Sequence, residues 1–373
     1  ESSAASDVYK RQILMSLLPS MSFAQGITLG TWNTRDGGVY NGEIQGGKAH
    51  GKGRVVYQNG NHYDGNYQKG KRHGKGTFTF NDGEKYEGEW FQDHQHGHGT
   101  YYFSNNNKYV GLWFRDEQDG HGVMYYYNGD KYDGNWSKDR RTGKGTYTYA
   151  GGAYYKGEWL NDKKNGKGVF HWGDGSSYEG SWKDNVRSGQ GTFRYADGDV
   201  YTGQWLNDIQ HGKGIYKFRN GDVYQGDYVQ GERTGTGICT YANGNKYTGQ
   251  FVDGAKQGQG TMNYKNGDVY VGMWHADKCN GAGKLKLKNG NVYEGTFKNG
   301  VLDGTCVEHH QDGSKFKGEY KNGMRNGAAI EEDKNGNRFE GTYKDGKRDG
   351  KYVERDSNGN ITAQGVYVRG RKK

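Results

Sequence analysis

Three histidines at alternate positions, His94, His96 and His98, are the residues of this chain most suggestive of chemistry. Alternate side chains of an extended segment point the same way, so three imidazoles could ligate a transition metal. Alternatively, they are polar residues standing where equivalent segments use Lys, Asn or Ser. His73 and His121 cannot complete a site, because equivalent strands lie about 10 Å apart. We therefore expect no metal ligands.

Gly-x-Gly pairs such as Gly51-Lys52-Gly53 recur along the chain and could suggest phosphate-binding loops. A phosphate loop needs a helix whose N-terminus caps the anion, and no helical pattern follows these glycines. We interpret the pairs as tight bends between β-hairpins. No Ser/His/Asp or Cys/His triad can be assembled from recurring positions, and no acidic pair stands out. We therefore expect no catalytic residue, no cofactor and no enzyme.

Cys239, Cys279 and Cys306 are odd in number and irregularly spaced, which predicts neither a disulfide framework nor a metal quartet. The formal charge of +9 is small beside 52 basic and 43 acidic residues, and the two signs are interleaved. Nucleic-acid binders carry a dense basic stripe, so we expect no nucleic-acid partner.

Lysines recur at the middle position of several Gly-x-Gly pairs. A basic edge of this kind would attract anionic phospholipid headgroups by about 1 kcal/mol per charge. The alternative is a solvated surface that keeps the protein soluble, and interleaved acids such as Asp162 favour it. The candidate lipid-facing residues are Lys52, Lys75, Lys144, Lys167 and Lys213.

These residues belong to a 23-residue repeat built on an aromatic residue, a glycine and a second aromatic residue at alternate positions. The unit occurs 14 times, with first positions from Tyr40 to Phe339, and seven of the nine tryptophans occupy its third position. A fixed period of this length indicates a repeat array. The predicted structural core of seven successive units comprises Tyr63, Gly65, Tyr67, Tyr86, Gly88, Trp90, Tyr109, Gly111, Trp113, Tyr132, Gly134, Trp136, Tyr155, Gly157, Trp159, Tyr178, Gly180, Trp182, Tyr201, Gly203 and Trp205.

The units predict β-hairpins, because in most of them an Asn-Gly or Asp-Gly pair stands between two short alternating runs, with Asn105-Asn106 as one departure. We expect the aromatic residues of both strands to share one face, since only then can a common face be buried. A single-layer sheet has no second layer to cover its rings. Part of the aromatic ladder could therefore bind glycans, peptides or quaternary amines. The alternative is that the rings are consumed by packing on each other.

Units such as Tyr86-Glu87-Gly88-Glu89-Trp90 followed by Gly97-His98-Gly99 resemble the MORN repeat (membrane occupation and recognition nexus). The resemblance runs from about residue 30 to the C-terminus. It implies an all-β fold: an elongated, twisted, single-layer antiparallel sheet of stacked β-hairpins. We divide the chain into regular repeats at 30–303 and divergent C-terminal repeats with a basic tail at 304–373.

The last three units depart from the pattern, because Cys306, Ala329 and Tyr352 replace the second glycine. Their core-facing positions become acidic, as at Glu308, and apolar residues move one place, as at Val307. Either the strand reverses its faces, as a one-residue slip would do, or these units form a charged cap. A dimer contact through these units is the alternative to capping. They look like the variant repeats of bacterial exported MORN proteins.

Residues 1–12 fit nothing that follows, and we interpret them as a non-native or incomplete start. Residues 13–24 form a short apolar run ending in small residues, which resembles the end of a signal peptide cleaved after Ala24. A hydrophobic N-terminal cap is the alternative. We therefore expect export to the periplasm, the outer membrane surface or the outside of the cell.

The sequence thus predicts a non-enzymatic scaffold that recruits a protein partner or tethers the cell envelope. Peripheral binding of acidic phospholipid headgroups is one alternative. Binding of glycans or peptides on the aromatic face is another. The partner's identity, the envelope layer and the oligomeric state cannot be read from the residues.

Overall fold

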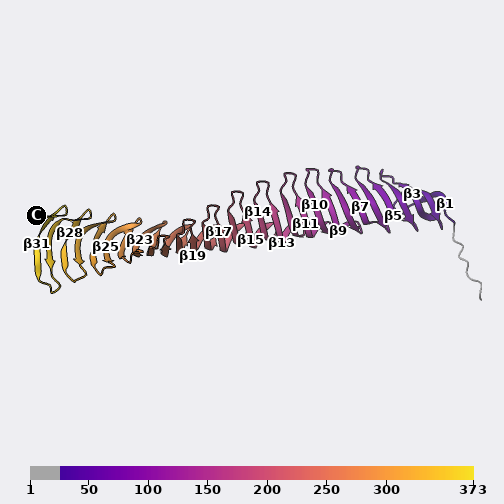
Figure 1. Ribbon diagram of the computed structural model, residues 1–373. Helices are drawn as coiled ribbons and strands as arrows, with labels where there is room; N and C mark the ends of the chain where they lie inside the picture. The colour runs from indigo at the N-terminus through magenta and orange to yellow at the C-terminus, as the bar shows by residue number, and fades with distance from the viewer. Residues whose placement is uncertain (1–25) are drawn as a thin grey trace, which may run out of the picture. The chain divides into compact units, whose positions relative to one another are not determined.

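The computed structural model describes residues 26–373, and the proposed start and signal segments, 1–12 and 13–24, lie outside the described residues. The chain divides into two compact units. The first runs to Ala150 and includes Leu160–Asp162, and the second comprises Gly151–Trp159 and Lys163–Lys373. Figure 1 shows strands joined as successive hairpins in both units. No helix occurs among the described residues, so the predicted all-β class is confirmed.

The first unit contains β1 to β11, and each strand pairs antiparallel with the next. Their bounds are β1 (Thr28–Asn33), β2 (Val39–Gln45), β3 (Lys48–Val56), β4 (His62–Gln68), β5 (Lys71–Thr79), β6 (Lys85–Phe91), β7 (His94–Tyr102), β8 (Lys108–Phe114), β9 (Glu117–Tyr125), β10 (Lys131–Ser137) and β11 (Arg140–Thr148).

All but the last residue of β12 (Tyr154–Leu160) and all later strands belong to the second unit. The bounds are β13 (Lys163–His171), β14 (Ser177–Lys183), β15 (Val186–Arg194), β16 (Val200–Leu206), β17 (Ile209–Lys217), β18 (Val223–Val229), β19 (Glu232–Thr240), β20 (Lys246–Val252), β21 (Ala255–Asn263), β22 (Val269–His275), β23 (Lys278–Lys286), β24 (Val292–Lys298), β25 (Val301–His309), β26 (Lys315–Lys321), β27 (Met324–Glu332), β28 (Arg338–Lys344), β29 (Lys347–Arg348), β30 (Gly350–Arg355), β31 (Ile361–Val368) and β32 (Arg371–Lys372).

The Asn-Gly and Asp-Gly pairs do form the hairpin turns. At Asn59-Gly60, the amide of Gly60 donates to the Tyr57 carbonyl and the amide of Tyr57 donates to the Asn61 carbonyl. Only Gly60 has positive φ, at 87°. This is a three-residue loop with a glycine bulge, not a two-residue turn.

The Gly-x-Gly pairs are not bends between hairpins, and that expectation was wrong. Gly51-Lys52-Gly53 lies inside β3, where Gly53 pairs with Gly42 and with Gly65. The register shifts beside Gly42, so Gly51, with φ of 62°, belongs to a β-bulge. The hairpins are joined instead by two-residue turns such as Lys69-Gly70, where both residues have positive φ.

The core is a repeated arrangement of rings on one face of the sheet, called here the ring face; the opposite face is the outer face. Tyr86 is fully buried, and its hydroxyl donates to the Glu89 carbonyl at 2.9 Å. Trp90 meets Tyr86 edge-on at 5.2 Å and the preceding unit's Tyr63 at 5.3 Å. The Trp90 indole donates to the Gly76 carbonyl at 3.1 Å. Each unit is therefore completed by its neighbour.

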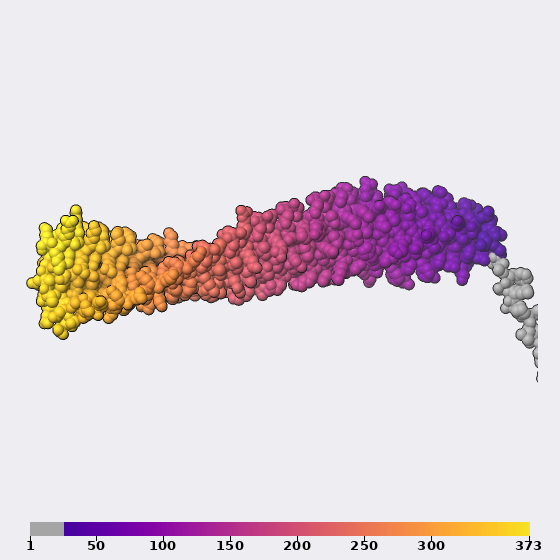
Figure 2. Space-filling model, viewed as in Figure 1, coloured from indigo at the N-terminus to yellow at the C-terminus, as the bar shows by residue number. Residues whose placement is uncertain are grey.

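The predicted core residues all lie in this arrangement. Tyrosines at the first position are fully buried from Tyr63 to Tyr201, and tryptophans at the third position are at most 6% exposed. The glycine between them has no room for a side chain, because a Cβ at Gly88 would lie 2.5 Å from the Tyr86 hydroxyl. In Figure 2 the colour changes gradually along each of the two compact units, because residues that are neighbours on the surface come from adjacent repeats.

Candidate binding surfaces

Many units carry a cation at one position of the 23-residue repeat on the ring face, above the third-position ring of the next unit. The guanidinium of Arg72 lies 4.3 Å from the centre of Trp90, and that of Arg187 lies 4.4 Å from Trp205. Lys164 lies 4.6 Å above Trp182. Burial lowers the pKa of Lys164 from its ordinary value. We call this position the cation slot.

Where the turn between hairpins carries an aspartate, that residue holds the cation in its slot. Asp208 has a positive φ of 67°, and its carboxylate accepts from the Arg187 amide at 2.8 Å and from Arg187 Nε at 2.9 Å. The Asp208 amide donates back to the Arg187 carbonyl, and Arg187 Nη2 donates to the Asp208 carbonyl at 2.8 Å. These reciprocal hydrogen bonds connect residues that are 21 positions apart in the sequence, and they join one hairpin to the next.

A groove of about 600 Å³ opens on the ring face of β5 to β9. It is lined by Phe80 and Phe103, both half-buried, and by the buried Gln95 and Gln118, which stand in the cation slots of two successive units. The remaining lining residues are Arg72, Phe78, Trp90, Asp93, Tyr101, Trp113, Asp116 and Asp139. The groove thus combines aromatic walls with a carboxylate rim.

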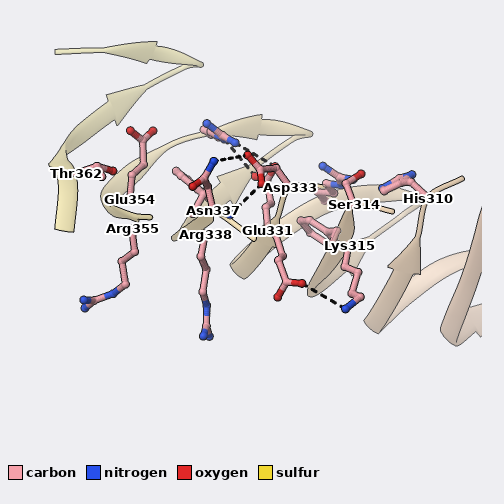
Figure 3. A pocket seen from close by; sticks show the side chains of 15 residues that line it. His310, Ser314, Lys315, Glu331, Asp333, Asn337, Arg338, Glu354, Arg355 and Thr362 are labelled. Carbon is pink, nitrogen blue, oxygen red and sulfur yellow. Dashed lines mark hydrogen bonds and ion pairs between the residues drawn. The ribbon is translucent and has the colours of Figure 1, made fainter. Parts of the chain in front are cut away.

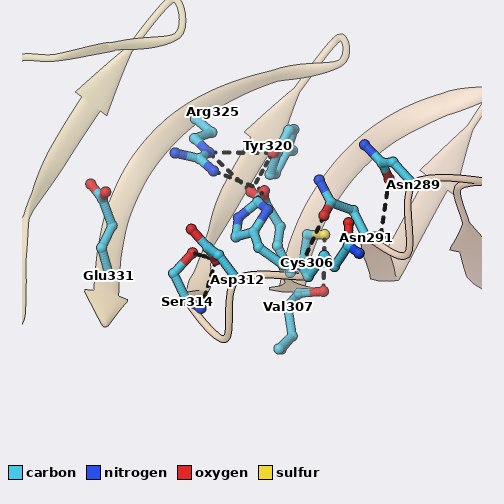
Figure 4. Close-up of polar contacts among 12 residues, drawn as sticks. Asn289, Asn291, Cys306, Val307, Asp312, Ser314, Tyr320, Arg325 and Glu331 are labelled. Atoms are coloured by element: carbon cyan, nitrogen blue, oxygen red, sulfur yellow. Dashed lines mark hydrogen bonds and ion pairs between the residues drawn. The ribbon is translucent and has the colours of Figure 1, made fainter. Parts of the chain in front are cut away.

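The acidic positions of the C-terminal units remain core-facing, so of the two alternatives considered for these units, the reversal of the strand faces is wrong. Glu308 is 1% exposed and pairs in register with Tyr293 and Phe316. Its carboxylate accepts from Tyr320 at 2.5 Å and from Arg325 Nε and Nη2 at 2.9 and 2.8 Å (Figure 4). A bidentate arginine and a phenol therefore compensate the buried charge.

The same cluster repeats one unit later. Glu331 accepts from Tyr343 and from Arg348, whose guanidinium lies 3.8 Å above Phe339. Polar side chains of β26 to β31 line a second groove beside it, of about 520 Å³ (Figure 3). Both signs are present there and several are paired, as in the 3.3 Å contact between Lys315 and Glu332. The groove therefore offers no uniform charge to a ligand.

The candidate lipid-facing lysines all lie exposed on the outer face, within strands. Lys213 pairs with Asp227 at 2.5 Å, and Lys167 donates to Ser181 at 2.9 Å. Lys75 stands opposite Glu89 in register, and Lys52 stands opposite Asn66. Lys144 lies in β11. Acidic neighbours thus interrupt this row, and lipid binding stays a prediction.

The histidines of β7 are separated by their contacts. His94 Nδ1 lies 2.5 Å from Asp116, whereas His96 packs between the rings of Phe91 and Phe114. His98 is exposed. Within residues 26–373, no three His, Cys, Asp or Glu side chains are grouped so as to hold a metal.

The three cysteines are buried thiols. Burial raises the pKa of the Cys279 and Cys306 thiols to about 11. Such thiols are poor nucleophiles at neutral pH.

Sequence reasoning missed the cation slots and the buried Glu308 and Glu331 clusters. The signal for the slots was present, because Arg, Lys or Gln recurs there at the repeat period. The signal was overlooked because a charged residue at the start of a strand normally indicates a solvated position.

The MORN repeat profile matches 14 consecutive segments, from residues 40–62 to residues 339–361. The chain belongs to the MORN repeat family. Its segments follow one another without a gap, so this repeat scaffold accounts for most of the chain. The match indicates no catalytic family.

Solved structures show weak likenesses to this MORN chain. The TCP10 domain of Danio rerio CPAP, in complex with a STIL peptide, is 12% identical with a TM-score of 0.26, over 72% of this chain and 93% of that one. The TCP domain of Drosophila melanogaster SAS-4, with a proline-rich motif of Ana2, is 17% identical with a TM-score of 0.28, over 48% and 90%. TM-scores this low support no conclusion.

Among curated proteins, none matches the chain. Within its described part, the MORN chain has no helix long and apolar enough to cross a membrane.

Proposed function

We propose that this MORN array is a non-enzymatic scaffold that binds an extended segment of a protein partner on the ring face of β5 to β9. The observation that carries the proposal is the groove of about 600 Å³ walled by Phe80 and Phe103. Aromatic walls supply contact area at low entropic cost, and the carboxylate rim supplies orientation.

The groove suits a chain rather than a compact ligand. It crosses several strands, from Arg72 on β5 to Gln118 on β9. An extended peptide lying across the strands can place side chains about three residues apart in successive units. The rings at its base are held by their neighbours, so little ordering would accompany binding.

We further propose that the protein works at the cell envelope after export, which rests on the leader-like pattern of residues 13–24. Fusing residues 1–30 to a reporter active only outside the cytoplasm tests this location. Reporter activity is the expected result, and a silent fusion that is nevertheless produced would contradict export.

Partner capture with two matched variants tests the proposed binding face. Phe80→Glu with Phe103→Glu alters the groove, and Thr77→Glu with Val110→Glu adds the same charge to the outer face. Circular dichroism should show an intact sheet in both. We expect the wild type and the outer-face variant to capture the same protein from an extract of the source cells. The groove variant should fail to capture it. Equal capture by both variants would refute the groove as the binding face.

Flotation with anionic liposomes tests the alternative function, binding of acidic phospholipid by the outer face. If the outer-face lysines bind phospholipid, wild-type protein should float with the vesicles and a variant with glutamine at all five positions should not. Flotation that survives moderate salt and depends on these lysines would favour the lipid function over the protein scaffold.

A further inference from the structure

The cation slot is occupied by different residue types along the array. Within the described residues the slots hold Ala49, Arg72, Gln95, Gln118, Arg141, Lys164, Arg187, Gln210, Arg233, Lys256, Cys279, Leu302, Arg325 and Arg348. Two pairs of neighbouring slots lack a cation, Gln95 with Gln118 and Cys279 with Leu302, and the glutamine pair lines the groove.

Filled slots show which contacts a cation makes there. Arg72 lies over the face of Trp90, with its guanidinium also 5.3 Å from the Phe78 ring. Its Nη2 donates to the carbonyl of Asp93 at 2.9 Å, and its Nε lies 3.5 Å from the Asp93 carboxylate. The slot therefore provides a ring face, a carboxylate and a carbonyl oxygen.

The glutamine slots keep this environment. Trp113 occupies the position below Gln95, and the Gln95 amide donates to the Asp116 carboxylate at 2.7 Å. The Gln118 amide donates to the Asp139 carboxylate at 2.8 Å. Both carboxylates are thus fixed as in the filled slots. In the described part of the chain, no Lys or Arg lies over Trp113.

The glutamine side chains can themselves contact a ligand. Gln95 is 8% exposed and Gln118 is 5% exposed, and both line the groove. The side-chain amide oxygen of a glutamine can accept a hydrogen bond from a guanidinium.

We propose that arginine side chains of the partner segment fill the slots above Gln95 and Gln118, an inference that rests on the proposed scaffold function. Each guanidinium would contact the carboxylate of Asp116 or Asp139 beside the glutamine, above Trp113 and Trp136, which are only 6% and 5% exposed. The charged groups that line the groove are Asp93, Asp116, Asp139 and Arg72. Arg72 is paired with Asp93, and His94 Nδ1 lies 2.5 Å from Asp116. Three carboxylates against one arginine in the lining favour a cationic ligand.

The spacing of the slots defines the ligand further. Neighbouring slots are separated by two strands, or about 10 Å. A polyproline II segment rises about 3.1 Å per residue with three residues per turn, so its side chains at i and i+3 face the same way and lie about 9 Å apart. The predicted ligand is therefore a polyproline II segment with arginines at i and i+3.

Isothermal titration of the full chain with a terminally blocked peptide tests the inference. The probe carries two arginines three residues apart in a Ser/Thr background, and its matched control carries citrulline instead of arginine. We expect the arginine peptide to bind and the citrulline peptide to bind at least about tenfold more weakly, because citrulline keeps the shape but loses the charge.

Gln95→Arg with Gln118→Arg fills both slots from within and should weaken arginine-peptide binding by at least about tenfold. Gln190→Arg with Gln259→Arg adds the same charge at exposed positions and should leave binding unchanged. Asp116→Asn with Asp139→Asn keeps the oxygens that accept from the backbone but removes the charges, and should also weaken binding.

Three results would overturn the inference: no binding of the arginine peptide at millimolar concentration, equal binding of the citrulline peptide, or undiminished binding to the slot-filled variant. Displacement of the peptide by a neutral oligosaccharide would also overturn it in favour of a glycan. If the slot-filled variant still captures the protein partner through the ring face, the scaffold function stands and only this inference fails.

Discussion

At the residue scale, the first-position tyrosine and the second glycine of each unit depend on each other. The Tyr86 ring lies over Gly99, where a Cβ would stand 2.4 Å from its hydroxyl. The C-terminal units break both halves of the pair together, since Phe316 lies beside Ala329. Where only the glycine changes, at Cys306, the paired Tyr293 is not fully buried. The hydroxyl and the missing side chain therefore occupy one volume.

Gly99→Ala should therefore destabilise its hairpin by about 1–3 kcal/mol through overpacking. The double variant Gly99→Ala with Tyr86→Phe should recover part of the loss, because phenylalanine removes the hydroxyl oxygen, one of the three clashing atoms, and leaves the ring carbons Cε2 and Cζ. Hydrogen exchange of β6 and β7 amides measures this locally, which suits an array that need not unfold in two states. Equal destabilisation by the single and double variants would contradict the shared-volume explanation.

The buried tyrosines also predict an alkaline limit to stability. Burial raises the pKa of Tyr178 and Tyr224 to about 12, although Arg187 and Arg233 partly offset it. Because these pKa values exceed the ordinary value of about 10, their stabilising contribution is complete below pH 10 and is lost as the pH rises towards 12. As the pH rises, the phenolate absorbance of the buried tyrosines should appear together with the loss of the β-strand signal in circular dichroism. Titration of all tyrosines near pH 10 with the sheet intact would argue against this burial.

At the element scale, the turns between hairpins use aspartate where glycine would be less strained. Asp208 accepts the Arg187 amide, whereas the equivalent position of the next unit is Gly231, with φ of 87°. The carboxylate contact offsets the cost of about 1–2 kcal/mol for a left-handed non-glycine residue. In both units the turn amide still donates to the preceding unit's carbonyl.

Asp208→Ala should be more destabilising than Asp208→Gly by about 1 kcal/mol, because alanine loses the contact and keeps the backbone strain. Asp208→Asn retains the accepting oxygen and should be the mildest of the three. Hydrogen exchange of the backbone amides of β15 to β17 compares the local stability of the three variants. Indistinguishable alanine and glycine variants would show that the turn is not strained.

The hairpins and the shared aromatic face could be predicted because the 23-residue spacing and two-residue alternation determine them. The place of Gly51-Lys52-Gly53 could not, because a bulge and a bend both use glycine with positive φ. The buried Glu308 was missed because its compensation by Tyr320 and Arg325 depends on side chains brought together across strands. The groove depends on which residue fills each cation slot, and spacing alone does not show this.

At the scale of the whole molecule, stability should be a sum of units and their contacts with immediate neighbours. Deleting one complete repeat, residues 201–223, joins two equivalent positions and should preserve the circular dichroism spectrum and resistance to proteolysis. Deleting residues 201–212 removes about half a repeat and should disrupt the sheet, because later strands would run the wrong way. Unfolding of the full-repeat deletion would contradict neighbour-only stacking.

The central claim is that the ring face, rather than the outer face, receives the partner. Site-specific photo-crosslinking tests it directly, with benzoylphenylalanine placed either at Phe103 in the groove or at Val110, which is 39% exposed on the outer face. The account predicts a discrete protein adduct from Phe103 that the arginine peptide competes away, and none from Val110. An adduct from Val110 alone would contradict it.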